Sequence, residues 1–129
     1  MALLHNDVFD NGLGSLKTTV NNDITENLYI CSTLPTTFTE ASVTYKVGTK
    51  AAPQVATPSE RTGGGREVVV AAINDGVVNT NGGSAGYYAL TDDSASKLLA
   101  AGALSSAQTV YTANPFTLAA FAIGIPDPA

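Results

Sequence analysis

A stretch of 29 residues near the end of the chain carries no charge. Residues 98–126, "LLAAGALSSAQTVYTANPFTLAAFAIGIP", contain no Asp, Glu, Lys or Arg. A membrane-spanning helix needs about 20 predominantly apolar residues in a row, but Ser, Thr, Gln, Asn and Pro interrupt this stretch. We therefore expect no membrane span, and we expect these residues to form core strands and a surface that contacts other protein.

The composition predicts a single, weakly charged domain. A chain of 129 residues is long enough for one hydrophobic core without disulfides, and its single cysteine excludes an intrachain disulfide. Only 13% of the residues are charged, and the net charge of −5 with six scattered Lys and Arg argues against a nucleic-acid partner. The N-terminus lacks the basic and apolar regions of a signal peptide, so we expect synthesis in the cytoplasm.

The middle of the chain indicates antiparallel β-structure. Residues 26–35 alternate as a strand does and stop at a proline, residues 66–73 are rich in β-branched side chains, and short strands follow up to residue 125. Turns are expected at residues 74–76 and 81–83. The predicted fold is mainly β: a single-domain antiparallel β-sandwich or small barrel over residues 1–129, with a β-rich core over 66–125.

Three further segments are expected to differ from the strands. Residues 5–21 predict a short amphipathic N-terminal helix, weakened by two glycines, which needs another surface to pack against. A helical turn is also expected, with Thr37 or Thr39 as its N-terminal cap and its end at Gly48. Residues 49–65 are rich in Pro, Ala and Gly without periodicity, which predicts a long irregular loop or an interaction arm.

The closing segment changes its pattern halfway. Large side chains occupy even positions first (Phe116, Leu118) and odd positions afterwards (Phe121, Ile123, Ile125), which a bulge or burial on both faces would explain. One sheet face cannot cover both sets, and the weak helix also needs a partner surface. We therefore predict self-association, with these interface residues: Phe9, Leu13, Phe116, Leu118, Phe121, Ile123 and Ile125.

The side chains that could perform chemistry are sparse. His5 is the only histidine and lies beside the N-terminus, and Cys31 lies in an apolar strand without a base nearby, so no nucleophile–base pair is apparent. Asp92 and Asp93 offer few of the six or more oxygens that calcium takes, and a polar turn is the favoured interpretation. The sequence predicts that the chain is not an enzyme and has no catalytic, cofactor or metal site.

Two motifs suggest ligands but fit ordinary structure better. The segment "SERTGGGR" at residues 59–66 lacks the Gly-Lys-Ser/Thr ending of a phosphate-binding loop. Tyr87 and Tyr88 could stack against a sugar, but adjacent strand residues point to opposite faces. One of the two tyrosines is therefore expected in the core.

Several long segments resemble a family of small structural proteins encoded by tailed bacteriophages and prophages. The resemblance lies in "NDVFDNGLGSL", "LYICSTLPTTFTEASVTYKVGTK", "GGGREVVVAAINDGVVNTNGGSAGYYALTDDSASKLLAAGAL" and "NPFTLAAFAIGIPDP", and it covers most of the chain. It implies a virion protein, most like a capsid cement or decoration protein on the outside of the shell. The implied partners are the major capsid protein and further copies of the chain in a homotrimer, since capsid lattices offer three-fold positions.

Two alternative functions stay open at this point. The chain could be another virion component, such as a head–tail completion, tail or fibre protein. It could also be a ligand-binding module, for carbohydrate for example, or a weak enzyme. The resemblance includes no site motif, so no functional residue is transferred from the family.

Overall fold

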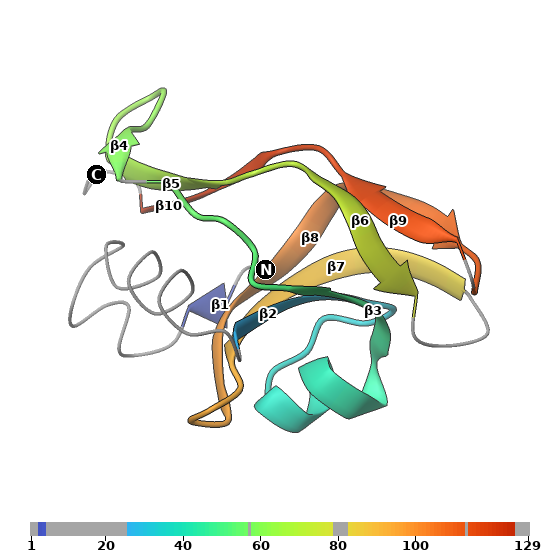
Figure 1. Cartoon of the computed structure of the whole chain (residues 1–129). Helices are drawn as coiled ribbons and strands as arrows, with labels where there is room; N and C mark the ends of the chain where they lie inside the picture. Colours follow the sequence, from blue (N-terminus) through green and yellow to red (C-terminus); the bar gives the residue numbers. More distant parts are fainter. Residues whose placement is uncertain (1–2, 5–25, 57, 79–82, 113, 126–129) are drawn as a thin grey trace.

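The computed structural model describes residues 3–4, 26–56, 58–78, 83–112 and 114–125. Its strands form two antiparallel sheets, one of them curled into a half-barrel (Figure 1), which confirms the mainly β, antiparallel prediction. The strands are β1 (Leu3–Leu4), β2 (Glu26–Cys31), β3 (Lys46–Ala51), β4 (Ser59–Glu60), β5 (Arg66–Val70), β6 (Ile73–Val78), β7 (Gly83–Asp92), β8 (Lys97–Val110), β9 (Pro115–Leu118) and β10 (Phe121–Ile125).

The larger sheet has the order β1-β8-β7-β2-β3-β6-β9 among the described residues. Its longest pairing joins β7 to β8, from Gly83 opposite Val110 to Asp92 opposite Lys97. The smaller sheet has the order β10-β5-β4. Figure 1 shows the long strand pair that β5–β6 forms with β10–β9: its β5–β10 end lies over the curled sheet, and its β6–β9 end is part of that sheet.

That strand pair changes sheets at a short stretch of alanines. Val70 of β5 lies opposite Phe121 of β10, and Ile73 of β6 lies opposite Leu118 of β9. The intervening residues, 71–72 on one strand and 119–120 on the other, are all alanine. The break at 119–120 coincides with the change from even to odd large positions, so each half of the closing segment keeps its own alternation and turns its large side chains into the core.

The main core lies between the two sheets. Leu28 and Ile30 of β2, Leu90 of β7 and Val68 of β5 are fully buried there. Alternate residues of β2 face the other way, so Tyr29 and Cys31 belong to a second, smaller buried cluster. A strand buried on both faces explains why residues 28–31 read as a nearly continuous apolar run.

The smaller cluster is covered by the connection between β2 and β3. This connection contains a short π-helix, η1 (Glu40–Thr44), in which the Tyr45 N–H donates to the Glu40 carbonyl at 2.8 Å. The Glu40 N–H donates to the Thr37 hydroxyl at 3.1 Å, as in the capped helix start expected there. The helical turn ends at Thr44, before the expected Gly48, because Lys46–Ala51 pairs with β2 as β3.

Two expectations about connections need correction. Residues 74–76 do not form a turn: they lie inside β6, where the pairing with β9 is irregular between Ile73 and Gly76.

The segment 49–65 is less irregular than expected, because it includes the end of β3, a bridge from Val55 to Val70 and strand β4. Burial of Val55 against β5 holds this segment to the protein. The β-structure thus also extends N-terminal to the predicted core of 66–125. The predicted helix over 5–21 and the turn at 81–83 lie wholly or mainly outside the described residues.

Phe116 packs against the backbone of two neighbouring strands. Its side chain is 1% exposed and covers Gly76, its partner in β6. A Cβ atom added to Gly76 would lie 2.1 Å from Phe116 Cε2, and one added to Gly48 would lie 3.0 Å from Phe116 Cδ2. The aromatic ring therefore occupies the space that two side chains would otherwise fill, and this fixes β9 at the edge of the curled sheet.

We predict that Gly76→Ala lowers the free energy of unfolding by about 1–3 kcal/mol or more, because overpacking forces the Phe116 ring or the backbone to move. Gly86→Ala is the matched control in β7, since its Cβ would meet only Ala107 Cβ at an ordinary 3.8 Å. Urea unfolding followed by circular dichroism measures both. Equal stability losses in the two variants would contradict this account of Phe116.

Candidate functional site

The uncharged segment 98–126 folds back on itself in the described structure. Its first residues, 98–102, are buried in β8. The following residues of β8 are mostly exposed, and β9 and β10 return alongside them. The charge-free sequence thus supplies core through residues 98–102 and the large side chains of β9 and β10, and an exposed surface between them.

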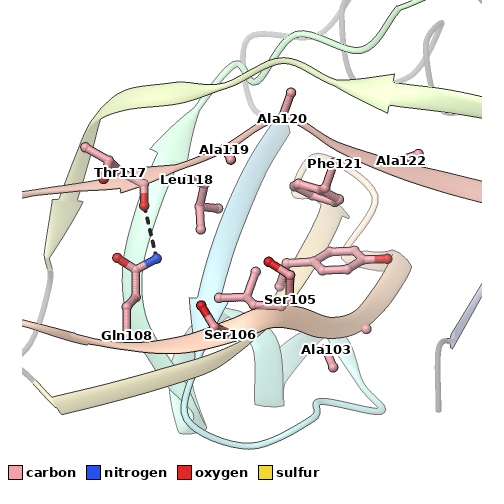
Figure 2. Close-up of a pocket in the computed structure, with 13 residues that line it drawn as sticks. Ala103, Ser105, Ser106, Gln108, Thr117, Leu118, Ala119, Ala120, Phe121 and Ala122 are labelled. Atoms are coloured by element: carbon pink, nitrogen blue, oxygen red, sulfur yellow. Dashed lines mark hydrogen bonds between the residues drawn. The ribbon is translucent and has the colours of Figure 1, made fainter.

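A groove of about 610 Å³ lies between the two limbs of this segment. One wall is residues 103–108 of β8, and the other is residues 117–122 of β9, β10 and their junction (Figure 2). The lining residues, all uncharged, are Tyr88, Gly102, Ala103, Leu104, Ser105, Ser106, Gln108, Thr117, Leu118, Ala119, Ala120, Phe121 and Ala122. We call this the β8–β10 groove.

A wide bulge in β8 forms the first wall. Ala103 pairs with Tyr87, and Gln108 pairs with Ala85, so the four residues 104–107 of β8 face only Gly86 of β7. Extra residues on one strand bend it and leave their backbone outside the ladder. The bulge therefore moves residues 104–107 away from β7 and gives the groove a wall of backbone and small side chains.

The second wall is held at both ends. At one end, Gln108 Nε2 donates to the Thr117 carbonyl at 3.0 Å, the contact drawn across the groove in Figure 2. At the other end, the Phe121 ring packs on the Tyr88 ring with centroids 4.5 Å apart and planes tilted by 43°. The first contact holds β9 to β8, and the second holds β10 to Tyr88 of β7, which lies opposite Gly102 of β8.

Tyr88 contributes a buried hydroxyl to the groove. The residue is 7% exposed, and burial raises the pKa of its phenol to about 12. Among the contacts of the described residues, its Oη has no hydrogen-bond partner. A buried hydroxyl usually has one, so Tyr88 offers a neutral donor and acceptor to a bound ligand.

The predicted interface residues are used within the chain. Phe116, Leu118 and Ile123 belong to the main core, and Phe121 and Ile125 are partly buried against it. Phe9 and Leu13 lie outside the described residues. A contact made by the closing segment would therefore use its backbone and its small, exposed residues more than these large side chains.

The two acidic residues considered for calcium both accept hydrogen bonds in and beside the β7–β8 turn. Asp92 accepts from Ser94 Oγ at 2.7 Å and from the Ala95 N–H at 3.2 Å. Asp93 accepts from Tyr29 Oη at 2.7 Å and also from the Thr91 hydroxyl. Within the described ranges, no group of three or more His, Cys, Asp or Glu residues is placed to hold a metal ion.

The glycine-rich motif at residues 59–66 forms a hairpin between β4 and β5. Gly63, Gly64 and Gly65 have φ angles of 91°, 101° and 96°, which side chains other than glycine rarely adopt. Arg61 Nη1 donates to the Gly64 carbonyl at 2.9 Å across this turn. The glycines therefore serve the turn, in agreement with the sequence interpretation.

Of the two adjacent tyrosines, Tyr88 lies in the main core and Tyr87 packs partly buried against the smaller cluster on the opposite face. This confirms the expected alternation. The groove itself was not predicted from the sequence. Ser105, Ser106, Gln108 and Thr117 gave no motif, and the only signal was their place in the charge-free segment.

The chain matches no family model, no curated protein and no solved structure. Its described part also contains no helix of the length and apolar character needed to cross a membrane.

Cys31 is expected to be unreactive in the folded protein. Its thiol is fully buried, lies 3.8 Å from the Ala41 carbonyl oxygen that accepts its hydrogen bond, and burial raises its pKa to about 12. Because the thiolate is the reactive form, Ellman's reagent at pH 8 should label Cys31 only as fast as the protein unfolds. Urea-unfolded protein, which should release one equivalent at once, is the control, and immediate labelling of the folded chain would contradict this assignment.

Proposed function

We propose that this chain is a structural virion protein of a tailed bacteriophage, which binds the outside of the capsid shell as a cement or decoration protein and stabilises it. The observation that carries the proposal is the uncharged, exposed surface of β8 and the β9–β10 segment, built around the β8–β10 groove. Interface cores are depleted in charged residues, and this surface has none. The resemblance to phage structural proteins points in the same direction.

The described side chains favour binding over catalysis. The groove contains no acid, base or ionisable nucleophile at neutral pH, since its one titratable group, Tyr88, has a raised pKa. Cys31 is buried away from the groove, and Asp93 is held by its hydrogen bonds. A protein that acts through such a surface recognises its partner by shape and backbone contacts.

The proposed partners are the major capsid protein and further copies of this chain. Strand β10 is an edge of the smaller sheet in the described structure, and it carries no charge or proline that would discourage pairing. Identical chains usually close into symmetric rings. A homotrimer with the closing segment at or beside the subunit contact matches the three-fold positions of a capsid lattice.

Electron microscopy of purified virions from the encoding phage tests the location. We expect added density over the whole capsid surface in the wild type, and loss of that density in virions from a phage that lacks this gene. Such virions should also break at lower temperature or lower salt than the wild type. Density confined to a vertex or the tail would contradict the cement role and favour a completion or fibre protein.

Light scattering of the purified protein tests the oligomer. We expect a mass three times the 13.1 kDa of the chain, because pairing at the β10 edge would join subunits. The measurement should be repeated over a dilution series, which separates a stable trimer from weak association. A mass of one chain at every concentration would contradict the trimer.

A further inference from the structure

We propose that the β8–β10 groove is a strand-addition site, which binds an extended, uncharged peptide segment of a partner protein along residues 103–108 of β8. This inference concerns the kind of ligand and holds whether or not the partner is a capsid protein. It rests on the backbone of the bulge, the small side chains around it, the absence of charge and the buried Tyr88 hydroxyl.

Among the described residues, much of the β8 backbone is left outside strand pairing at this place. On its outer side, among the described residues, β8 pairs only through Ala100 and Ala101 with β1. On its inner side, the bulge separates residues 104–107 from the β7 ladder. Backbone N–H and C=O groups are strong hydrogen-bonding groups that stay paired when covered, so a partner that covers this wall must supply matching donors and acceptors. An extended peptide does so along its whole length.

The side chains around the groove let another backbone approach closely. Ala103, Ser105 and Ser106 line one wall, and Ala119 and Ala120 line the other. Natural proteins usually protect an exposed strand edge with Lys, Pro or an inward-pointing charge, and residues 103–108 have none of these. The edge is therefore chemically suited to pairing.

The ligand should be uncharged and partly apolar. The described lining of the groove has no charged residue to pair with an ion, and a charge buried without a partner is strongly unfavourable. Leu118 and Phe121 give the groove apolar surface, and Tyr88 Oη gives it one neutral polar group. A volume of about 610 Å³ lies within the range of ordinary ligand sites. At about 3.3 Å per strand residue, the wall of residues 103–108 matches a segment of roughly six residues.

A peptide fits these features better than a carbohydrate does. A sugar ring would need an exposed aromatic face, but the Phe121 ring is partly buried and packs against Tyr88. The groove presents backbone groups in a strand, which is the pattern that another strand completes. Carbohydrate binding is therefore one of the outcomes that would overturn the proposal.

The test begins with a displayed library of random octapeptides, selected on the immobilised full-length protein. The peptide enriched most strongly is then synthesised, and its dissociation constant is measured by calorimetry for the wild type and for variants.

The first variant, Ser106→Trp, places a large side chain in the groove. Proline at Ser105 or at Ser106 removes one backbone N–H, and since adjacent strand residues point their N–H groups to opposite sides, one of the two should face the peptide. Ser105→Ala is the matched control that keeps the backbone donor. Val43→Trp, at an η1 position 69% exposed and outside the groove, controls for an added aromatic.

We expect Ser106→Trp and at least one proline variant to bind about tenfold more weakly or worse, while Ser105→Ala and Val43→Trp stay within about threefold of the wild type. Hydrogen exchange of the wild type should show slower exchange of amides in residues 103–108 when the peptide is bound. Circular dichroism and thermal melts identify any variant that has lost its fold, and Ser106→Trp, at an exposed position, keeps the test valid if the proline variants unfold.

Four results would overturn the proposal. The first is a library that yields no enriched peptide, and the second is that the enriched peptides bind Ser106→Trp as tightly as the wild type. The third is an equal loss of peptide affinity in Ser105→Ala and both proline variants, and the fourth is binding of an oligosaccharide that Ser106→Trp abolishes. The virion microscopy can fail while this site is confirmed, and the reverse also holds, so the two proposals are tested separately.

Discussion

The packing of Phe116 over Gly76 and Gly48 is the contact on which the rest of this structure depends. It joins three neighbouring strands, because Phe116 lies in β9, Gly76 in β6 and Gly48 in β3. Two strand glycines cost conformational entropy, and the buried aromatic ring offsets that cost by filling the space above them. With β9 fixed at this edge, β10 must continue over the main core, and the β8–β10 groove lies between that pair of strands and β8.

The four alanines at residues 71–72 and 119–120 have a related role. They lie where both strands of the long pair leave the curled sheet and enter the smaller one. Small side chains allow the pair to bend over the core edge without a clash, and the large residues on either side keep their alternation. Alanines at 119–120 also border the groove. The same small residues therefore allow the change of sheet and give this wall of the groove short side chains.

The sequence predicted the fold class better than the connections. Alternation in residues 26–31 and the β-branched run at 66–70 correctly indicated strands β2 and β5, because burial against a sheet imposes a period of two on the chain. Strand β2 ends at Cys31, however, before the expected end at Pro35. The turn predicted at residues 74–76 was wrong, although the pair Asp75–Gly76 is typical of tight turns. Here Gly76 is required by Phe116, forty residues away in sequence, and no local pattern reports such a contact. The bend at residues 119–120 left a visible trace in the switch of large side chains, although the sequence alone could not separate a change of sheet from a bulge.

The groove could not be predicted because its walls are defined by pairing that spans distant residues. The bulge at residues 104–107 exists only relative to Gly86 in β7, and Gln108 meets Thr117 only after the chain has turned back.

The absence of charge from residues 98–126 was nevertheless informative. The structure separates the positions where burial explains the missing charge from those where it does not. Buried positions such as Leu98 and Ala100 exclude charge because they are core. Exposed positions such as Ser105, Ser106 and Ala120 have no such reason, since Lys or Glu at an exposed strand position costs little. Strand β5 shows this on the same molecule, with Arg66 exposed and paired to Glu60. Folding therefore accounts for the buried positions of the uncharged segment, and the strand addition proposed above would account for the exposed ones.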